Sequence, residues 1–256
     1  MNSSITATSI VSYIEQIIQF PNFRFARGES KQYPMPFLPS VWRLGKNPND
    51  APIEDSSCFT IGELELLKDF QAKVISEEIV DPYFNRFIGD LENEIDLQSE
   101  HLWHWLAFAQ HYGTDTRLTD VTSDAFAALF FATSANNDKD GFVYIFQDNF
   151  NIVERDNLSL VETGDTFFDI NAILDDPEDK HPRQPQGDTT TVIIPSFPNR
   201  RIESQKGAFC FVKDHNIPAY WGGQLAFRIP ANNKVEIVAD LAKLGYTEQS
   251  LFPPKY

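Results

Sequence analysis

Cysteine, long apolar runs and a targeting signal are all scarce or missing in this sequence. Only Cys58 and Cys210 occur among 256 residues, and they form no CxxC spacing. Both lie among apolar or small residues, so we expect two reduced thiols, with a disulfide as the alternative. No stretch reaches the roughly 20 apolar residues of a membrane span. Residues 1–16 lack the basic start and apolar run of a signal peptide. These absences predict a cytoplasmic protein that does not bind membranes.

Basic residues are also in short supply. Lys and Arg total 21 against 37 Asp and Glu, which gives a formal net charge of −16. Extended nucleic acid and anionic membranes are bound through clustered cations, so this charge argues against both as partners. A local basic pocket for one small anion is compatible with the composition.

The usual catalytic signatures are absent as well. There is no GxGxxG after a strand, no Walker loop, no GxSxG elbow and no HExxH, which argues against a familiar NTPase, Rossmann enzyme or zinc protease. His101, His104 and His111 share one helical stripe, an arrangement that could bind a transition metal. However, His111 lies about 10 Å along the helix axis from His104, and aromatic residues surround all three. We therefore predict aromatic packing and no metal.

The sequence does contain enough apolar material for a folded core. Hydrophobic residues make up 42% of the chain and include 22 phenylalanines, which argues against disorder. No internal repeat and no clear linker divides the chain, and residues 175–190 are typical of a loop. We predict one α+β domain over residues 1–256, with a mixed, mainly antiparallel sheet and flanking helices. The predicted helices are 9–20, 61–80, 102–111, 123–133 and 238–244, and the predicted strands are 23–28, 142–146, 191–197, 207–212 and 224–229.

The densest polar cluster spans residues 110–123 and links two apolar helices. Buried polar groups need partners, so two interpretations arise. In the structural one, Arg117 pairs with Asp120, and Thr122 or Ser123 caps the helix that begins near Asp124. In the functional one, hydroxyls and an arginine at a helix N-terminus bind a phosphate or another anion.

The string WLAFAQHYGTDTRLTDVTS at residues 105–123 resembles the FRG domain family. Members typically show an AQHxGxPTRLLDWT run followed by an apolar ALFFA helix, here residues 128–132. The family is named for a Phe-Arg-Gly triplet, and this chain has Ala26-Arg27-Gly28 in its place. Further departures in the central motif are Asp115 for Pro, Thr119 for Leu and Val121 for Trp.

Three more segments extend the resemblance over residues 23–253. LPSVWR at 38–43 matches the family's LxPSLxR segment, RIESQKGAF at 201–209 matches RIxxQxGxF, and LFP at 251–253 matches the C-terminal LFP. The family occurs in bacteria and phages, so the resemblance implies a role in phage defence or as a toxin.

The order of elements is also similar to that of ADP-ribosyltransferases, which implies an ADP-ribosyltransferase-like fold and NAD as substrate. By this similarity Arg27 holds the phosphates, and Thr122 and Ser123 position ribose or nicotinamide. Glu203 is the catalytic carboxylate, although the family motif points to Gln205, and a glutamine cannot serve as a base.

The remaining site residues are expected to bind the ligand, with Tyr112 or a phenylalanine as a stacking platform. They are Gly28, His111, Tyr112, Arg117, Asp120 and Arg201. The resemblance implies either an NAD-dependent ADP-ribosyltransferase or NAD-cleaving enzyme with a possible protein target. The alternative is a non-enzymatic module that binds a nucleotide-like or protein ligand in the same pocket.

Overall fold

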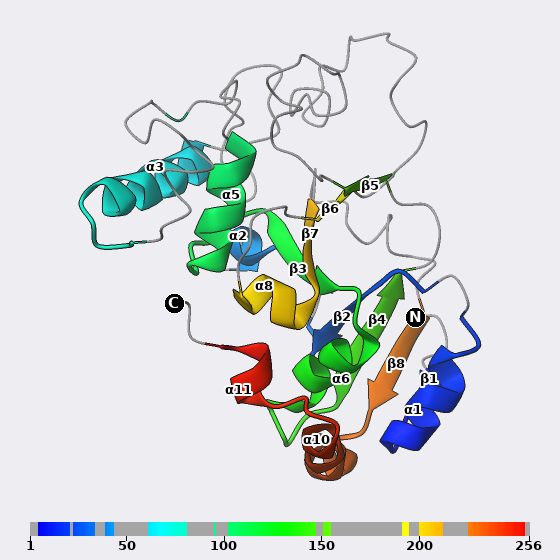
Figure 1. The fold of residues 1–256 in the computed structure, drawn as a ribbon. Helices are drawn as coiled ribbons and strands as arrows, with labels where there is room; N and C mark the ends of the chain where they lie inside the picture. The colour runs from blue at the N-terminus through cyan, green and yellow to red at the C-terminus, as the bar shows by residue number, and fades with distance from the viewer. Residues whose placement is uncertain are drawn as a thin grey trace, which may run out of the picture.

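A computed structural model describes residues 5–20, 23–33, 39–43, 61–80, 95, 102–146, 151–154, 191–194, 200–211 and 225–253. Its strands form one eight-stranded sheet in the order β1-β8-β4-β2-β3-β7-β6-β5 (Figure 1). Two neighbouring pairs are parallel, β1 with β8 and β5 with β6, and the other pairs are antiparallel. The predicted α+β class with a mixed, mainly antiparallel sheet is therefore confirmed.

The elements in the described part of the chain have the following bounds. The strands are β1 (Ile5–Thr6), β2 (Phe25–Glu29), β3 (Leu118–Thr122), β4 (Gly141–Phe146), β5 (Asn151–Glu154), β6 (Thr191–Ile194), β7 (Gly207–Phe211) and β8 (Leu225–Ile229). The helices are α1 (Ile10–Ile17), α2 (Ser40–Arg43), α3 (Ile61–Ile75), α5 (Leu102–His111), α6 (Ala125–Thr133), α8 (Arg200–Gln205), the 3-10 helix η3 (Ala231–Asn233), α10 (Lys234–Lys243) and α11 (Glu248–Leu251).

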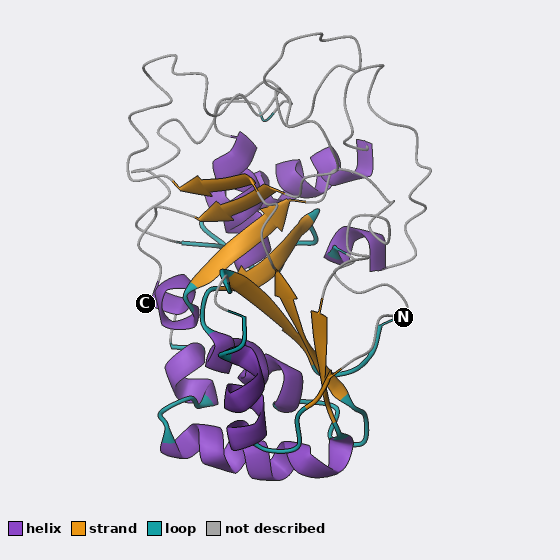
Figure 2. Cartoon of the chain, turned by 90° about the vertical axis from the view of Figure 1, so that its right-hand side faces the viewer, coloured by secondary structure: helices purple, strands orange, loops and turns teal. Residues whose placement is uncertain are grey.

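Helix α6 lies close against the sheet. Its residues are apolar almost all round, as a helix buried on every side requires. A Cβ at Gly28 would lie 1.9 Å from the carbonyl oxygen of Ala128, and one at Gly141 would lie 2.1 Å from that of Ala132. Glycine at both strand positions therefore allows the helix backbone to touch the sheet. Together with α1, α10 and α11, α6 forms the core over β2, β4 and β8, and Figure 2 shows helices gathered beside these strands.

Two buried polar side chains anchor the ends of α6. The Tyr13 hydroxyl donates to the carbonyl of Ala125 at 3.0 Å. Past the other end, the Lys234 ammonium donates to the carbonyls of Ala135 at 2.8 Å, Asn136 at 3.1 Å and Ser30 at 2.6 Å. A cation stabilises the carbonyl end of a helix, so Lys234 fixes α6 to the turn after β2.

Every predicted helix and strand is present, and the structure adds elements that were not predicted. Helix α5 has the predicted bounds, while α6 begins at Ala125 and α10 begins at Lys234. Residues 118–122, expected to be part of a polar connector, form the central strand β3. Residues 200–205, for which no helix was predicted, form helix α8.

Other expectations meet the structure only in part. Cys210 is free and buried, as expected for a reduced thiol. Cys58, the predicted loop 175–190 and the imidazole rings of His101 and His104 lie outside the described residues. Within the described part of the chain, every helix is too short or too polar to cross a membrane.

Candidate functional site

The sheet opens at its centre, where β2 and β3 part. Strand β2 pairs with β4 over five residues but shares a single pair with β3, Ala26 opposite Thr122. Strand β3 pairs along its whole length with β7 on its other side. Beyond the shared pair, Arg27 bridges the two strands, because its Nη1 donates to the carbonyl of Asp120 at 2.7 Å. A guanidinium thus takes the place of the missing strand pairing.

A cavity of about 280 Å³ lies over this opening. Its floor consists of β2, β3 and β7, and its walls come from the end of α5, from α6 and α8, and from Phe252 after α11. Thr122 lies opposite Ala26 and Gly207, and Asp120 lies opposite Phe209, so one face of the sheet presents Asp120 and Thr122 together. Seven predicted site residues line the cavity: Arg27, Gly28, His111, Asp120, Thr122, Arg201 and Gln205.

Arg27 is mostly buried at the edge of the cavity, with a side chain 15% exposed. Its Nε donates to Glu29 Oε1 at 3.0 Å, and its Nη1 donates to the Asp120 carbonyl. These two bonds hold the guanidinium in place and use two of its five N–H groups. The remaining N–H groups can donate to an anion in the cavity.

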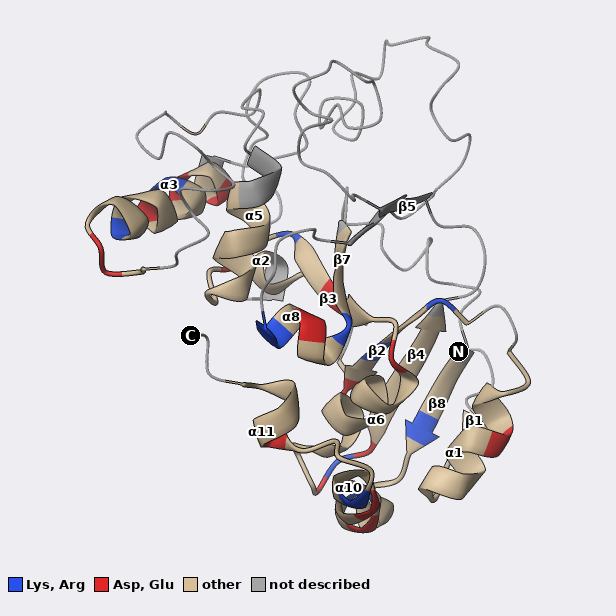
Figure 3. Ribbon diagram, in the orientation of Figure 1, with Lys and Arg blue, Asp and Glu red and all other residues tan. Residues whose placement is uncertain are grey.

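An aromatic wall with a second guanidinium closes another side. The ring of Phe252 packs edge-on against Phe131 at 5.8 Å between centroids. The Arg201 guanidinium lies 4.7 Å from the Phe252 centroid, over the ring, which is a cation–π contact. Helix α8 carries charges of both signs, as Figure 3 shows. The cavity therefore offers two arginines and an aromatic platform within an acidic protein.

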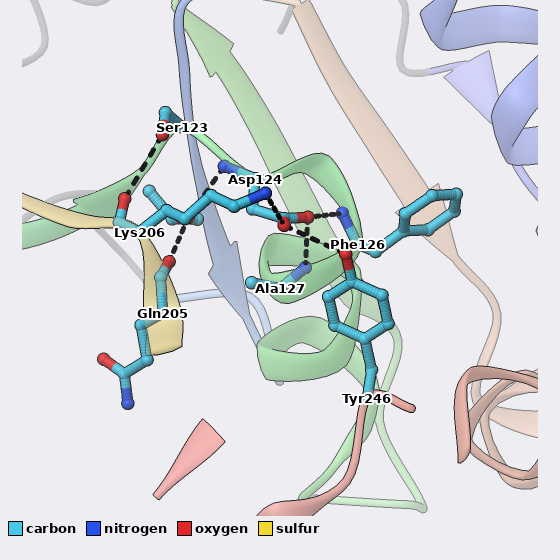
Figure 4. A network of polar contacts seen from close by, with 8 residues as sticks. Ser123, Asp124, Phe126, Ala127, Gln205, Lys206 and Tyr246 are labelled. Carbon is cyan, nitrogen blue, oxygen red and sulfur yellow. Dashed lines mark hydrogen bonds and ion pairs between the residues drawn. The ribbon is translucent and has the colours of Figure 1, made fainter. Parts of the chain in front are cut away.

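The end of β3 is fastened to the turn between α8 and β7. Figure 4 shows the contacts that do this. The Thr122 hydroxyl donates to the carbonyl of Gln205 at 2.6 Å and accepts from the amide of Asp124 at 2.9 Å. Ser123 donates through its amide to the carbonyl of Lys206 at 3.0 Å. The Thr122 hydroxyl proton is already donated, and Ser123 lies outside the cavity lining. Both residues therefore hold the end of β3 in place beside the cavity.

The N-cap of α6 is Asp124, so the expectation that Thr122 or Ser123 caps this helix is wrong. Asp124 Oδ1 accepts from the amides of Phe126 at 2.9 Å and Ala127 at 3.2 Å. Its Oδ2 accepts from Lys206 Nζ and from the Tyr246 hydroxyl, each at 2.9 Å (Figure 4). Burial by itself would raise the pKa of Asp124, but these hydrogen bonds outweigh it and lower the pKa. Burial, together with the hydrogen bond to Asp124, raises the pKa of Tyr246 to about 12.

Arg117 pairs with Glu63, and the expected Arg117–Asp120 pair is wrong. Arg117 Nε lies 2.8 Å from Glu63 Oε1, and its Nη2 lies 2.6 Å from Oε2. The two side chains are 1% and 4% exposed. This bidentate pair fixes the start of β3 to α3 and does not line the cavity. The predicted ligand-binding residue Arg117 therefore has a structural position.

Two more predicted site residues lie outside the cavity lining. Glu203 is exposed on α8, and the Tyr112 ring packs against Phe70 at 6.1 Å and His111 at 5.2 Å. The carboxylate that does line the cavity belongs to Asp120, whose Oδ2 accepts from Gln110 Nε2 at 3.2 Å. Nine lining residues were not predicted as site residues, among them Gln110, Phe131 and Phe252. These three lie in segments that resemble the family, and their place in those segments could have identified them as site residues.

The comparisons with known proteins agree with one part of the sequence analysis. The family model of the FRG domain matches residues 24–141. No curated protein and no solved structure matches the chain, so the ADP-ribosyltransferase-like fold stays a prediction. The matched span contains β2, β3, α5 and α6, which supply the parting strands and two walls of the cavity. The predicted resemblance to the FRG domain family is thus confirmed over residues 24–141.

Proposed function

We propose that the cavity binds a small nucleotide-like anion, with NAD as the first candidate. The observation that carries this proposal is the presence of Arg27 and Arg201 at one cavity in a chain of net charge −16. Guanidinium groups bind phosphate oxygens through charge-assisted, often bidentate hydrogen bonds. Because the negative net charge of the chain repels anions in general, the local concentration of arginine at this cavity is stronger support for anion binding.

The size and walls of the cavity support the same ligand class. Small-molecule pockets typically measure about 300–1,000 Å³, so a cavity of about 280 Å³ fits one half of a dinucleotide. The other half would extend past the rim. Phe252, with Arg201 over its ring, provides a platform against which a base or nicotinamide can stack.

Cleavage of NAD is the second candidate function, and the carboxylate of Asp120 in the cavity favours it. In hydrolysis, the bond between nicotinamide and C1′ of ribose breaks, and nicotinamide leaves with the electron pair. Water then bonds to C1′ and releases a proton. A carboxylate near C1′ stabilises the oxocarbenium-like transition state. Asp120 lies in the cavity and Glu203 does not, so Asp120 is the better candidate for this role. With a protein nucleophile in place of water, the same chemistry is ADP-ribosylation, which would suit a bacterial toxin or phage-defence protein.

Calorimetric titration of the full chain with NAD tests the binding proposal. Arg201→Ala should weaken binding about tenfold to a hundredfold, because a hydrogen bond to a charged group contributes about 1.5–3 kcal/mol. Arg200→Ala is the matched control, since Arg200 is the exposed neighbour outside the cavity lining and should leave affinity unchanged. Absence of binding by the wild type, or equal losses in both variants, would refute the proposal.

Release of nicotinamide separates the enzyme from the binding module. Chromatography of NAD incubated with wild type should show nicotinamide, and Asp120→Asn should abolish its release while NAD still binds. If wild type binds NAD and releases no nicotinamide, the chain is a binding module.

A further inference from the structure

Asp120 holds a carboxylate in the cavity without an ion pair to the nearest arginine. Its side chain is exposed to the cavity, and Oδ2 accepts from Gln110 Nε2 at 3.2 Å. Arg27 reaches the backbone carbonyl of the same residue and directs its Nε to Glu29. Within the described residues, Gln110 is the one side chain that donates to this carboxylate. The Oδ1 atom of Asp120 is thus available to accept a hydrogen bond from a ligand.

A series of hydrogen bonds fixes the orientation of the Asp120 carboxylate. The Gln110 Oε1 atom accepts from the Thr116 hydroxyl at 2.8 Å, which turns the amide nitrogen toward Asp120. The Thr116 hydroxyl also accepts from the amide of Leu118 at 3.1 Å, and the amide of Thr116 donates to Ser40 Oγ at 3.2 Å. Each link is anchored to the backbone, so the acceptor is preorganised before any ligand arrives.

The charge beside Asp120 indicates what kind of donor fits. A cationic donor would be attracted by the Asp120 carboxylate but repelled by the Arg27 guanidinium, which lies 2.7 Å from the Asp120 carbonyl. A neutral hydroxyl has no such penalty, and a carboxylate can accept from two vicinal hydroxyls at once. An acidic side chain that accepts from ribose hydroxyls is an established way to recognise nucleotides.

We propose that Asp120 recognises the ribose hydroxyls of the ligand, so that the cavity selects ribonucleotides over nucleotides that lack the 2′- and 3′-hydroxyls. This inference rests on the proposed function, because Arg27 and Arg201 must bind the phosphate while Asp120 selects the sugar. Gln110 is the residue that positions the Asp120 carboxylate.

The experiment compares the affinity of the full chain for nicotinamide mononucleotide, which contains the ribose whose C1′ reacts, and for its 2′,3′-dideoxy form. Wild type should bind nicotinamide mononucleotide about tenfold to a hundredfold more tightly, as expected for loss of one hydrogen bond to a charged group. Asp120→Ala should bind the two nucleotides equally and keep the wild-type affinity for the dideoxy form. The control is Asp115→Ala, a partly exposed aspartate in the loop before β3 and outside the cavity lining, which should keep the preference.

The outcomes separate this inference from the proposed function. If wild type binds both nucleotides equally, or Asp120→Ala keeps the preference, the role of Asp120 is refuted while anion binding stands. If wild type binds neither nucleotide nor NAD, the proposed function fails and this inference with it. Thermal unfolding of each variant checks that it is folded.

Discussion

Removal of Arg117 should destabilise the protein severely and leave the cavity itself unchanged. Arg117 is 1% exposed and its partner Glu63 is 4% exposed, with both oxygens of the carboxylate bonded to the guanidinium. Arg117→Ala would remove the guanidinium that contacts both oxygens of the buried Glu63 carboxylate, and breaking such a buried pair costs about 3–5 kcal/mol. For a chain of this size, each kcal/mol lowers the melting temperature by about 2–4 °C. We therefore expect a fall of roughly 6–20 °C.

Urea unfolding followed by circular dichroism measures this change as a shift of midpoint at constant slope. Glu63→Ala should cost a similar amount, because it removes the carboxylate that accepts from Nε and Nη2 of the buried guanidinium. The double variant Arg117→Ala/Glu63→Ala should cost clearly less than the sum of the two, since neither buried charge is then left unpaired. Arg117→Met/Glu63→Leu should lie near wild type, because well-packed apolar pairs often replace a buried ion pair without loss.

Two results would refute this reasoning. A cost below about 1 kcal/mol for Arg117→Ala is typical of an exposed pair and would mean that the pair is not buried. A stable Arg117→Ala variant that has lost its affinity for NAD would instead support the ligand-binding role expected from the sequence.

Gly28→Ala should destabilise the fold by at least about 1–3 kcal/mol, because its Cβ would meet the backbone of α6 at 1.9 Å. Gly207→Ala is the control, since its nearest neighbour is at 3.5 Å and the change in unfolding free energy should be small. Asp124→Ala should cost about 1–2 kcal/mol at neutral pH through loss of the N-cap. The folded state lowers the pKa of Asp124 below 3.8, so its contribution is present above pH 4–5 and is lost as the pH falls through that lowered pKa. Unfolding measured from pH 6 to pH 2 should therefore show the two proteins converge in acid, and a constant gap would contradict this.

Local sequence patterns were sufficient for the helices and for the composition of the site. The apolar residues of α5 predicted its bounds, and the all-apolar sequence of α6 predicted its burial. Gly245, which follows the predicted helix 238–244, has the positive φ of 90° that a residue just past a helix end favours. Arg27, Asp120 and Arg201 were predicted as site residues and do line one cavity.

The sequence by itself thus determined helices α1, α3, α5, α6 and α10, though not α2, α8 or α11, and which polar residues gather near the apolar helix. Only the tertiary structure decided that residues 118–122 form a strand, because the partners of Thr122 are Ala26 and Gly207, far away along the chain. It also decided that Arg117 meets Glu63, at a separation of 54 residues, while Asp120 stays in the cavity. A buried charge takes whichever opposite charge the packing places beside it, and no spacing along one segment encodes that choice.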